Sequence, residues 1–135
     1  MANPRNIRFY DGLDYHGTTY ALDGSSVFTQ VPAFGTNHSP QIGLAVALVA
    51  NAQAGLGASG GALLGKLIAV DPDANGTVQD RGYAQFSYPL NDATAPAVGS
   101  PVMVNGAGMV LKATAGLNRV ISVDTVNLLC IVQLV

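Results

Sequence analysis

Apolar and polar residues alternate most clearly between residues 96 and 112. Val102 and Val104 recur at every second position, as expected when one face of a strand is buried. The pair Asn105-Gly106 follows, and both residues tolerate the positive φ that tight hairpin turns require. A second apolar run, residues 109–111, leads back along the first. The pattern predicts a β-hairpin.

The chain around this hairpin consists of short apolar runs separated by turn residues. Residues 41–51 form a continuous apolar run that favours a buried strand, although the run is rich enough in alanine that a helix stays open. The glycine-rich residues 52–61 predict a flexible loop, and Gly82 predicts a bulge. Further strands are expected at residues 62–70 with a kink at Gly65, from residue 77 after the turn 71–76, and at residues 83–88, 119–124 and 126–135.

The last of these runs is apolar on both faces. One face carries Val126, Leu128, Cys130, Val132 and Leu134, and the other carries Leu129, Ile131 and Val135 with Asn127 and Gln133. An antiparallel sheet in a small domain usually leaves one face in water. The strand is therefore expected either in the centre of a closed barrel or in a contact between subunits. Together the runs predict an all-β domain, a small β-barrel or β-sandwich, over residues 43–135.

Residues 1–42 lack the regular spacing of the rest of the chain. Aromatic residues are scattered among polar and small ones without a sustained period, and only Val27 to Val31 suggests a short strand. We interpret residues 1–42 as an extended N-terminal arm whose aromatic side chains dock onto a protein surface. That surface belongs either to the same domain or to a neighbouring protein, and both alternatives stay open.

The composition narrows the range of functions. Apolar residues make up 49% of the chain and charged residues 10%, and glutamate is absent. So few charges leave little polar side-chain surface, and part of the apolar surface is expected to contact other chains. The net charge of −2 and the lack of a basic cluster argue against nucleic acid as a partner. No apolar window reaches the roughly 18 residues of a membrane span, so no membrane partner is expected.

The groups that usually carry catalysis are few. Cys130 is the only cysteine, and its apolar strand predicts a small buried hydrophobe with an unreactive thiol. His16 and His38 both lie in the arm, away from any nucleophile motif or paired metal ligands. We therefore expect no enzymatic activity and no cofactor, with a hydrolase site near His16 or His38 as a remote alternative.

Two short motifs suggest ligands. Gly55 to Gly60 matches G-x-G-x-x-G, but a dinucleotide site needs a helix after the motif, and a plain loop is expected instead. The Asp71–Asn75 loop, followed by Gly76, resembles the first half of a calcium loop. The twelfth position of that loop is Gly82 instead of a bidentate glutamate, which favours an ordinary turn. A calcium- or small-ligand-binding β module using the Asp71–Asn75 loop is kept as the alternative function.

The predicted hairpin also resembles a known family. Residues 98–110, VGSPVMVNGAGMV, are similar to the V-G-D-P-V-Y-V-(N/D)-G-x-G hairpin of tailed-phage capsid cement proteins, also called head decoration proteins. The closing strands, residues 119–124 and 126–134, are similar to the end of that family, and the resemblance covers about residues 62–135. Ser100 stands where the family has an acidic residue, and the arm and the glycine-rich loop have no counterpart in it.

The resemblance implies a structural virion protein. Such a protein is assembled in the host cytoplasm, sits on the outside of the phage head, and holds neighbouring major capsid subunits together. It implies a homo-oligomer, trimer or dimer, on the capsid lattice. Within this hypothesis the expected partner-binding residues are aromatic residues of the arm and apolar residues of the last strand: Phe9, Tyr10, Tyr15, Tyr20, Phe28, Phe34, Leu129 and Ile131.

Overall fold

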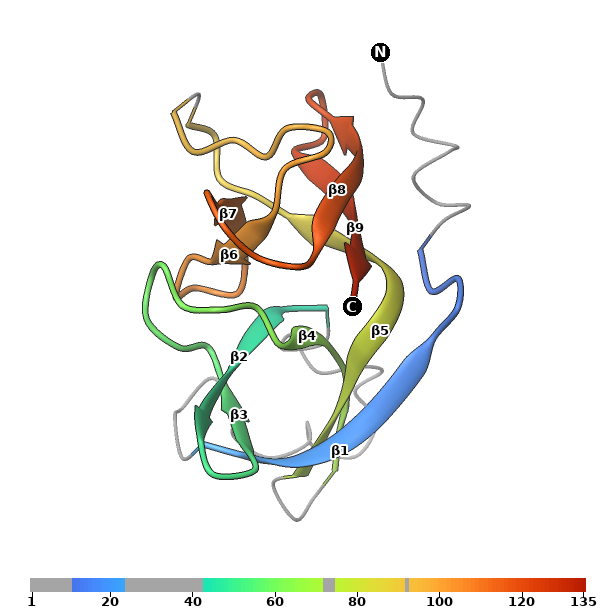
Figure 1. Cartoon of the computed structure of the whole chain (residues 1–135). Helices are drawn as coiled ribbons and strands as arrows, with labels where there is room; N and C mark the ends of the chain where they lie inside the picture. Colours follow the sequence, from blue (N-terminus) through green and yellow to red (C-terminus); the bar gives the residue numbers. More distant parts are fainter. Residues whose placement is uncertain (1–10, 24–42, 72–74, 92) are drawn as a thin grey trace.

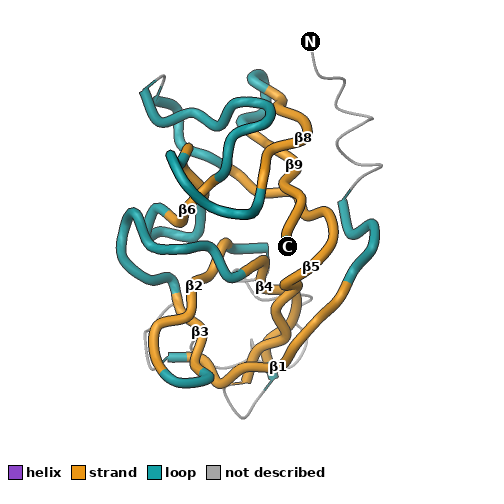
Figure 2. The backbone as a smooth tube through the Cα atoms, in the orientation of Figure 1, coloured by secondary structure: helices purple, strands orange, loops and turns teal. Residues whose placement is uncertain are grey.

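The computed structural model describes residues 11–23, 43–71, 75–91 and 93–135. Within these ranges the chain forms nine strands and no helix, which confirms the predicted all-β class (Figures 1 and 2). The strands are β1 (His16–Leu22), β2 (Ala45–Ala50), β3 (Gln53–Gly55), β4 (Gly65–Val70), β5 (Asn75–Ser87), β6 (Val102–Val104), β7 (Val110–Lys112), β8 (Arg119–Asp124) and β9 (Leu129–Leu134).

Five strands close into a small barrel. The order is β1-β3-β2-β4-β5, and β1 also pairs with β5, so the sheet returns to its first strand. β1 runs parallel to β3 and antiparallel to β5, and the other neighbours in the barrel are antiparallel. Closure removes the free sheet edges through which β-proteins aggregate. Of the two predicted architectures, the structure has the barrel.

The remaining strands form a second region, the C-terminal lobe (residues 82–135), above the barrel in Figure 1. β5 is shared, because its second half pairs with β9, which in turn pairs with β8. β6 and β7 form the predicted hairpin, with Val104 opposite Val110. Asn105 closes the hairpin loop by accepting hydrogen bonds at Oδ1 from the backbone N–H groups of Ala107 and Met109, at 2.7 and 3.0 Å.

β5 bends from the barrel into the lobe at Gly82. Its pairing with β1 shifts register beside Asp80, and its pairing with β9 begins at Gly82. Gly82 has φ +95°, and a Cβ atom there would lie 2.6 Å from the carbonyl carbon of Asp14. Only glycine fits this position without displacing backbone. The bulge predicted at Gly82 lies two residues earlier, at Asp80, and Gly82 itself is paired with Leu134.

A buried amide supports the bend. The side chain of Gln79 is 1% exposed. Its Nε2 donates hydrogen bonds to the carbonyl oxygens of Arg81 and Tyr83, at 3.3 and 3.0 Å, on either side of Gly82. A buried polar group needs such partners, so the amide and the bend stabilise each other.

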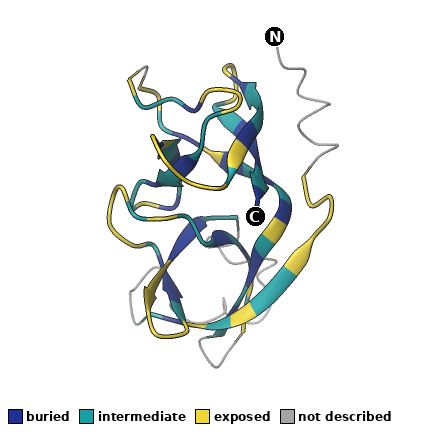
Figure 3. Ribbon diagram, viewed as in Figure 1, coloured by how far each residue is buried: buried dark blue, intermediate teal, exposed yellow. Residues whose placement is uncertain are grey.

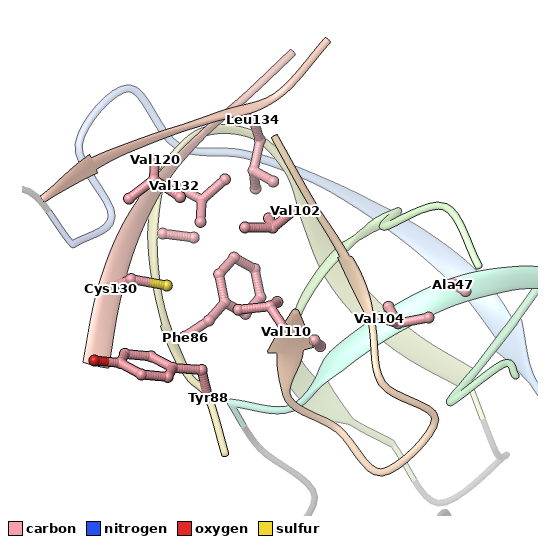
Figure 4. Close-up of a cluster of buried hydrophobic side chains, with 12 residues drawn as sticks. Ala47, Phe86, Tyr88, Val102, Val104, Val110, Val120, Cys130, Val132 and Leu134 are labelled. Carbon is pink, nitrogen blue, oxygen red and sulfur yellow. The ribbon is translucent and has the colours of Figure 1, made fainter. Parts of the chain in front are cut away.

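The lobe has the larger core. Phe86 lies at its centre, and Tyr88 and Cys130 lie beside it (Figure 4). The predicted alternation along residues 83–88 is confirmed, because Ala84, Phe86 and Tyr88 are all buried. The fully or nearly buried members of this cluster are Ala45, Ala47, Ala84, Phe86, Tyr88, Val102, Val104, Val110, Val120, Cys130, Val132 and Leu134.

The barrel has a smaller core of its own. Its buried members are Leu22, Val46, Ala54, Leu67 and Val78. β2 contributes to both cores, since Val46 faces the barrel interior while its neighbours on either side, residues 45 and 47, belong to the lobe core. The predicted buried strand is therefore correct for the first half of β2.

Two predictions about local structure are wrong. The flexible loop predicted at residues 52–61 contains β3, whose Ala54 is fully buried. β3 is held between β1 and β2, so pairing with distant strands overrides the glycine-rich composition. The strand predicted at residues 62–70 begins only at Gly65. Before it, Ala62 forms an isolated antiparallel bridge to Met103 of β6.

The predicted division between an arm (residues 1–42) and a β domain (residues 43–135) also needs correction. β1 lies within the supposed arm, yet it closes the barrel. Asp11 ties the preceding turn to the same domain: its carboxylate accepts hydrogen bonds from Lys66 Nζ at 3.2 and 3.3 Å and from the backbone N–H of Gln85 at 2.9 Å. Residues 11–23 therefore pack on their own chain. Most of the rest of the predicted arm, including Val27 to Val31, lies outside the described residues.

Candidate functional site

Exposed residues lie in several parts of the described chain (yellow in Figure 3). Some of them have large apolar side chains. They lie at the start of β1, at the end of β2 and in the turns of the lobe: Leu13, Tyr15, Leu48, Val49, Leu90, Val98, Leu117, Val126 and Val135. Single exposed apolar residues are normal on protein surfaces, whereas groups of them mark interaction sites. Two groups stand beside hollows in the surface.

The first group borders a hollow of about 650 Å³ at the end of β2, here called the β2 hollow. It is lined by Asp23 and by residues 47–49, 57–58 and 61–64. Leu48 and Val49 on its rim are 56% and 40% exposed. β4 pairs only with Ala45 and Val46 of β2, so among the described strands none pairs with the second half of β2 on that side.

The second group borders a cleft of about 440 Å³, here called the Leu117 cleft. Its walls come from residues 60 and 62–64, from β6, from the turn 113–118 and from the last two residues. None of these residues has a charged side chain. Residues 62–64 line both the cleft and the β2 hollow, so the two depressions are adjacent.

The predicted partner-binding residues differ in how exposed they are. Tyr15 is 48% exposed, whereas Tyr20 is half-buried and packs against the barrel core. Leu129 is half-buried. Ile131 is fully buried within its own chain, in the central strand of the lobe sheet, so its assignment as a partner-binding residue is wrong. The other predicted anchors, Phe9, Tyr10, Phe28 and Phe34, lie outside the described residues.

The sequence reasoning missed Leu48, Val49 and Leu117. The first two belong to the continuous apolar run that predicted a buried strand. A signal for Leu117 was available, because it stands between Gly116 and Asn118 in a turn, where a large apolar side chain has no strand face to occupy.

One polar cluster joins β1 to β5. Asp80 accepts hydrogen bonds from His16 Nδ1 at Oδ1 and from the Thr18 hydroxyl at Oδ2, both at 2.7 Å. Burial raises the pKa of Asp80, but the hydrogen bonds from His16 and Thr18 outweigh this effect, so the pKa lies below its ordinary value. The Thr18 hydroxyl is donated to Asp80 and not to His16, so the cluster lacks the nucleophile–base contact of a catalytic triad. It fixes the closing strand of the barrel.

The titratable side chains in the interior of the lobe are Cys130, Tyr88 and Asp124, and they have structural roles. Burial raises the pKa of Cys130 to about 12, so its thiol stays protonated and unreactive. Burial also raises the pKa of Tyr88, whose hydroxyl donates to the carbonyl oxygen of Asp124 at 3.3 Å. The side-chain amide and the backbone N–H of Asn127 lower the pKa of Asp124. These bonds fold the turn between β8 and β9.

The described residues of the Asp71–Asn75 loop and of the Gly55–Gly60 motif form a turn and the end of a strand. The backbone N–H of Asn75 donates to Asp71 Oδ1 at 3.0 Å, the contact expected of the ordinary turn. Asp73 lies outside the described residues, so the calcium alternative stays a prediction. Gly55 ends β3, and the residues from 56 to the start of β4 contain no helix. In the described parts of the chain, no three His, Cys, Asp or Glu side chains gather as a metal site requires.

Comparisons with known proteins leave the fold and its surface as the basis for function. No family model matches the chain, and neither a curated protein nor a solved structure matches it. Within the described ranges, no helix is both long and apolar enough to cross a membrane.

Proposed function

We propose that the chain is a non-catalytic structural virion protein, a capsid cement protein that binds the outer surface of a phage head between major capsid subunits. The observation that carries the proposal is the pair of depressions sharing residues 62–64. Exposed Leu48, Val49, Leu117 and Val135 border them, and among the described residues of their walls Asp23 has the only charged side chain. Surface of this kind is suited to burial against another protein.

The hairpin gives a second, independent line of support. Residues 98–110 resemble the cement-protein hairpin, and they fold as β6, a loop closed by Asn105, and β7. The acidic position of the family, occupied here by Ser100, serves a local purpose, because the Ser100 hydroxyl donates to the carbonyl oxygen of Ala97 at 2.6 Å. The proposal therefore has a sequence argument and a surface argument that do not depend on each other.

The scaffold suits a clamp between capsid subunits. A cement protein gains its effect from several weak contacts made at once, since each contact raises the effective concentration for the next. Such contacts must be held at fixed relative positions. A closed barrel joined to a lobe through the continuous strand β5 holds the two depressions on one framework.

Binding to phage heads tests the proposal. Purified protein is added to expanded heads of the phage that encodes it, prepared without the protein, and the heads are sedimented. We expect the wild-type protein to co-sediment. The variant Leu117→Ser should bind at least about tenfold more weakly, because it removes an exposed apolar contact from the Leu117 cleft.

The control is Leu90→Ser, which changes a residue that is 80% exposed but lines neither depression. It should bind like the wild type, and thermal unfolding should show that all variants are folded. The proposal is wrong if wild-type protein stays in the supernatant. The role of the Leu117 cleft is wrong if Leu117→Ser binds as tightly as the control.

A further inference from the structure

Five of the ten described residues that line the β2 hollow are very small: Ala47, Gly57, Ala58, Gly61 and Ala62. The larger side chains of Leu48, Val49, Leu63 and Leu64 line it as well. A Cβ atom on Gly57 would lie 2.9 Å from Cβ of Ala47, so these two small residues are closely packed. A lining rich in small residues leaves room for large side chains that come from outside.

The chemistry of the lining defines the occupant. Among the described residues of its lining, Asp23 has the only charged side chain, and the volume of about 650 Å³ lies within the range of roughly 300–1,000 Å³ that ligand pockets occupy. Because residues 62–64 also line the Leu117 cleft, the two depressions are adjacent and together offer a larger surface. An uncharged peptide segment with bulky apolar side chains matches this surface in charge and polarity.

The chain itself contains one segment of this chemistry. Residues 24–42, GSSVFTQVPAFGTNHSPQI, include no Asp, Glu, Lys or Arg, and they carry Phe28 and Phe34 among small and polar residues. The segment follows directly on Asp23, which lines the β2 hollow, and ends beside Gly43.

The segment is also much longer than its connection requires. Leu22 and Leu48 both pair with Ala54, so the end of β1 lies level with Leu48, five residues beyond Gly43. Five residues along the sheet and two strand spacings across it give a separation of about 20 Å. Nineteen extended residues can span about 60 Å. The surplus length allows the segment to reach a neighbouring molecule.

We propose that the β2 hollow is a self-association site that receives residues 24–42 of a second copy of this chain, with a phenylalanine of that segment seated in the hollow. The inference rests on the proposed function only in placing copies side by side. It names which surface and which segment join them.

Disulfide trapping between two different single-cysteine variants tests the site. One variant carries Ala58→Cys in the hollow, and the other carries Thr29→Cys or Thr36→Cys beside a phenylalanine of the segment. Cys130 is buried with a raised pKa and stays silent. After mixing and mild oxidation, the disulfide between the two variants should exceed that of a Leu90→Cys control by about tenfold, since docking raises the local thiol concentration.

A second measurement does not depend on cysteine chemistry. Sedimentation of the full chain should reveal an oligomer that Ala58→Lys dissociates, because it places a charge in the hollow, whereas Ala93→Lys at an exposed position outside both depressions leaves it intact. The inference is overturned if cross-linking between the two single-cysteine variants does not exceed that of the control. It is also overturned if a variant that carries both cysteines forms the disulfide within one chain while the mixed single-cysteine variants do not. Both experiments omit capsids, so binding to heads without trapping overturns only this inference, and trapping without binding to heads overturns only the cement function.

Discussion

The lobe and the barrel are stabilised in different ways. Among the described residues, twelve buried ones, including Phe86 and Tyr88, form the core of the lobe, whereas five form that of the barrel. The barrel has fewer buried side chains, but each of its five strands forms main-chain hydrogen bonds with two neighbours. The comparison indicates that side-chain packing holds the lobe together, whereas main-chain closure, completed by β1, holds the barrel.

This difference bears on the proposed function. The second half of β2, which has lost its pairing with β4, carries exposed Leu48 and Val49 beside the hollow. Apolar side chains of a strand are thus left exposed in the barrel. The lobe also exposes large apolar residues, but these lie in turns and at its last residue instead of in a strand.

Removing the largest buried side chain of each core should produce the largest effects. Phe86→Ala should lower the free energy of unfolding by about 3–5 kcal/mol, because it leaves a cavity at the centre of the lobe. Leu67→Ala, in the barrel, should lower it by about 2–3 kcal/mol, since a small core loses fewer contacts. Urea unfolding measures both. Equal losses would contradict the distinction between the two regions.

Cys130 reports on the lobe in the same experiment. Its thiol, with a pKa raised to about 12 by burial, should resist thiolate-specific reagents in the folded wild-type protein. Phe86→Ala should accelerate its modification more than Leu67→Ala does, because Cys130 belongs to the same cluster as Phe86. Rapid labelling of the wild-type protein would show that the lobe opens readily.

The junction of the two regions gives the next largest effect. Gly82→Ala should destabilise the protein by about 2–3 kcal/mol, because its φ of +95° strains any L-residue and its Cβ would meet the backbone of Asp14. Gly99→Ala is the matched control: φ is +87° there, but no atom lies within 4 Å of the added Cβ. Thermal unfolding should place the control about 1 kcal/mol below the wild type. Similar values for both variants would argue against a close approach at Gly82.

Acid should destabilise the pairing of β1, the closing strand of the barrel. The pKa of Asp80 is lowered below 3.8 in the folded state, so its contribution to stability is present above this value and is lost as the pH falls through the folded pKa. For an ion pair with an exposed histidine the loss is at most about 1 kcal/mol. Asp80→Asn should remove this part of the acid dependence. Hydrogen exchange in β1 between pH 5 and pH 3 measures it, and an unchanged profile in the variant would contradict the assignment.

The sequence predicted the lobe better than the barrel, for a physical reason. The strand at residues 119–124 and the buried positions of residues 83–88 follow from local alternation, which packing against one core preserves. β1 and β3 carry no such signal. They become strands because each finds neighbours on both sides, and the pairing of β1 with β5 joins residues about sixty positions apart.

The surface was harder to predict than the fold. Leu48 and Val49 continue the apolar run of Val46, and nothing in the local sequence marks the point where β4 ceases to cover them. Ile131 shows the opposite case, since an apolar residue on the second face of a strand was assigned to a partner but is covered by its own chain. Exposure depends on where neighbouring strands end, which the local pattern does not contain.

Two residues with the same strained backbone give the smallest effects and the sharpest comparison. Ala52 in the barrel and Leu128 in the lobe both have φ +55°. Ala52 is exposed, so Ala52→Gly should relieve the strain and stabilise the protein by about 0.5 kcal/mol. Leu128 packs against the lobe core, so in Leu128→Gly the lost packing should exceed the relieved strain and lower stability. Opposite signs in urea unfolding are expected. If Leu128→Gly were also stabilising, side-chain packing would not be the main source of stability in the lobe.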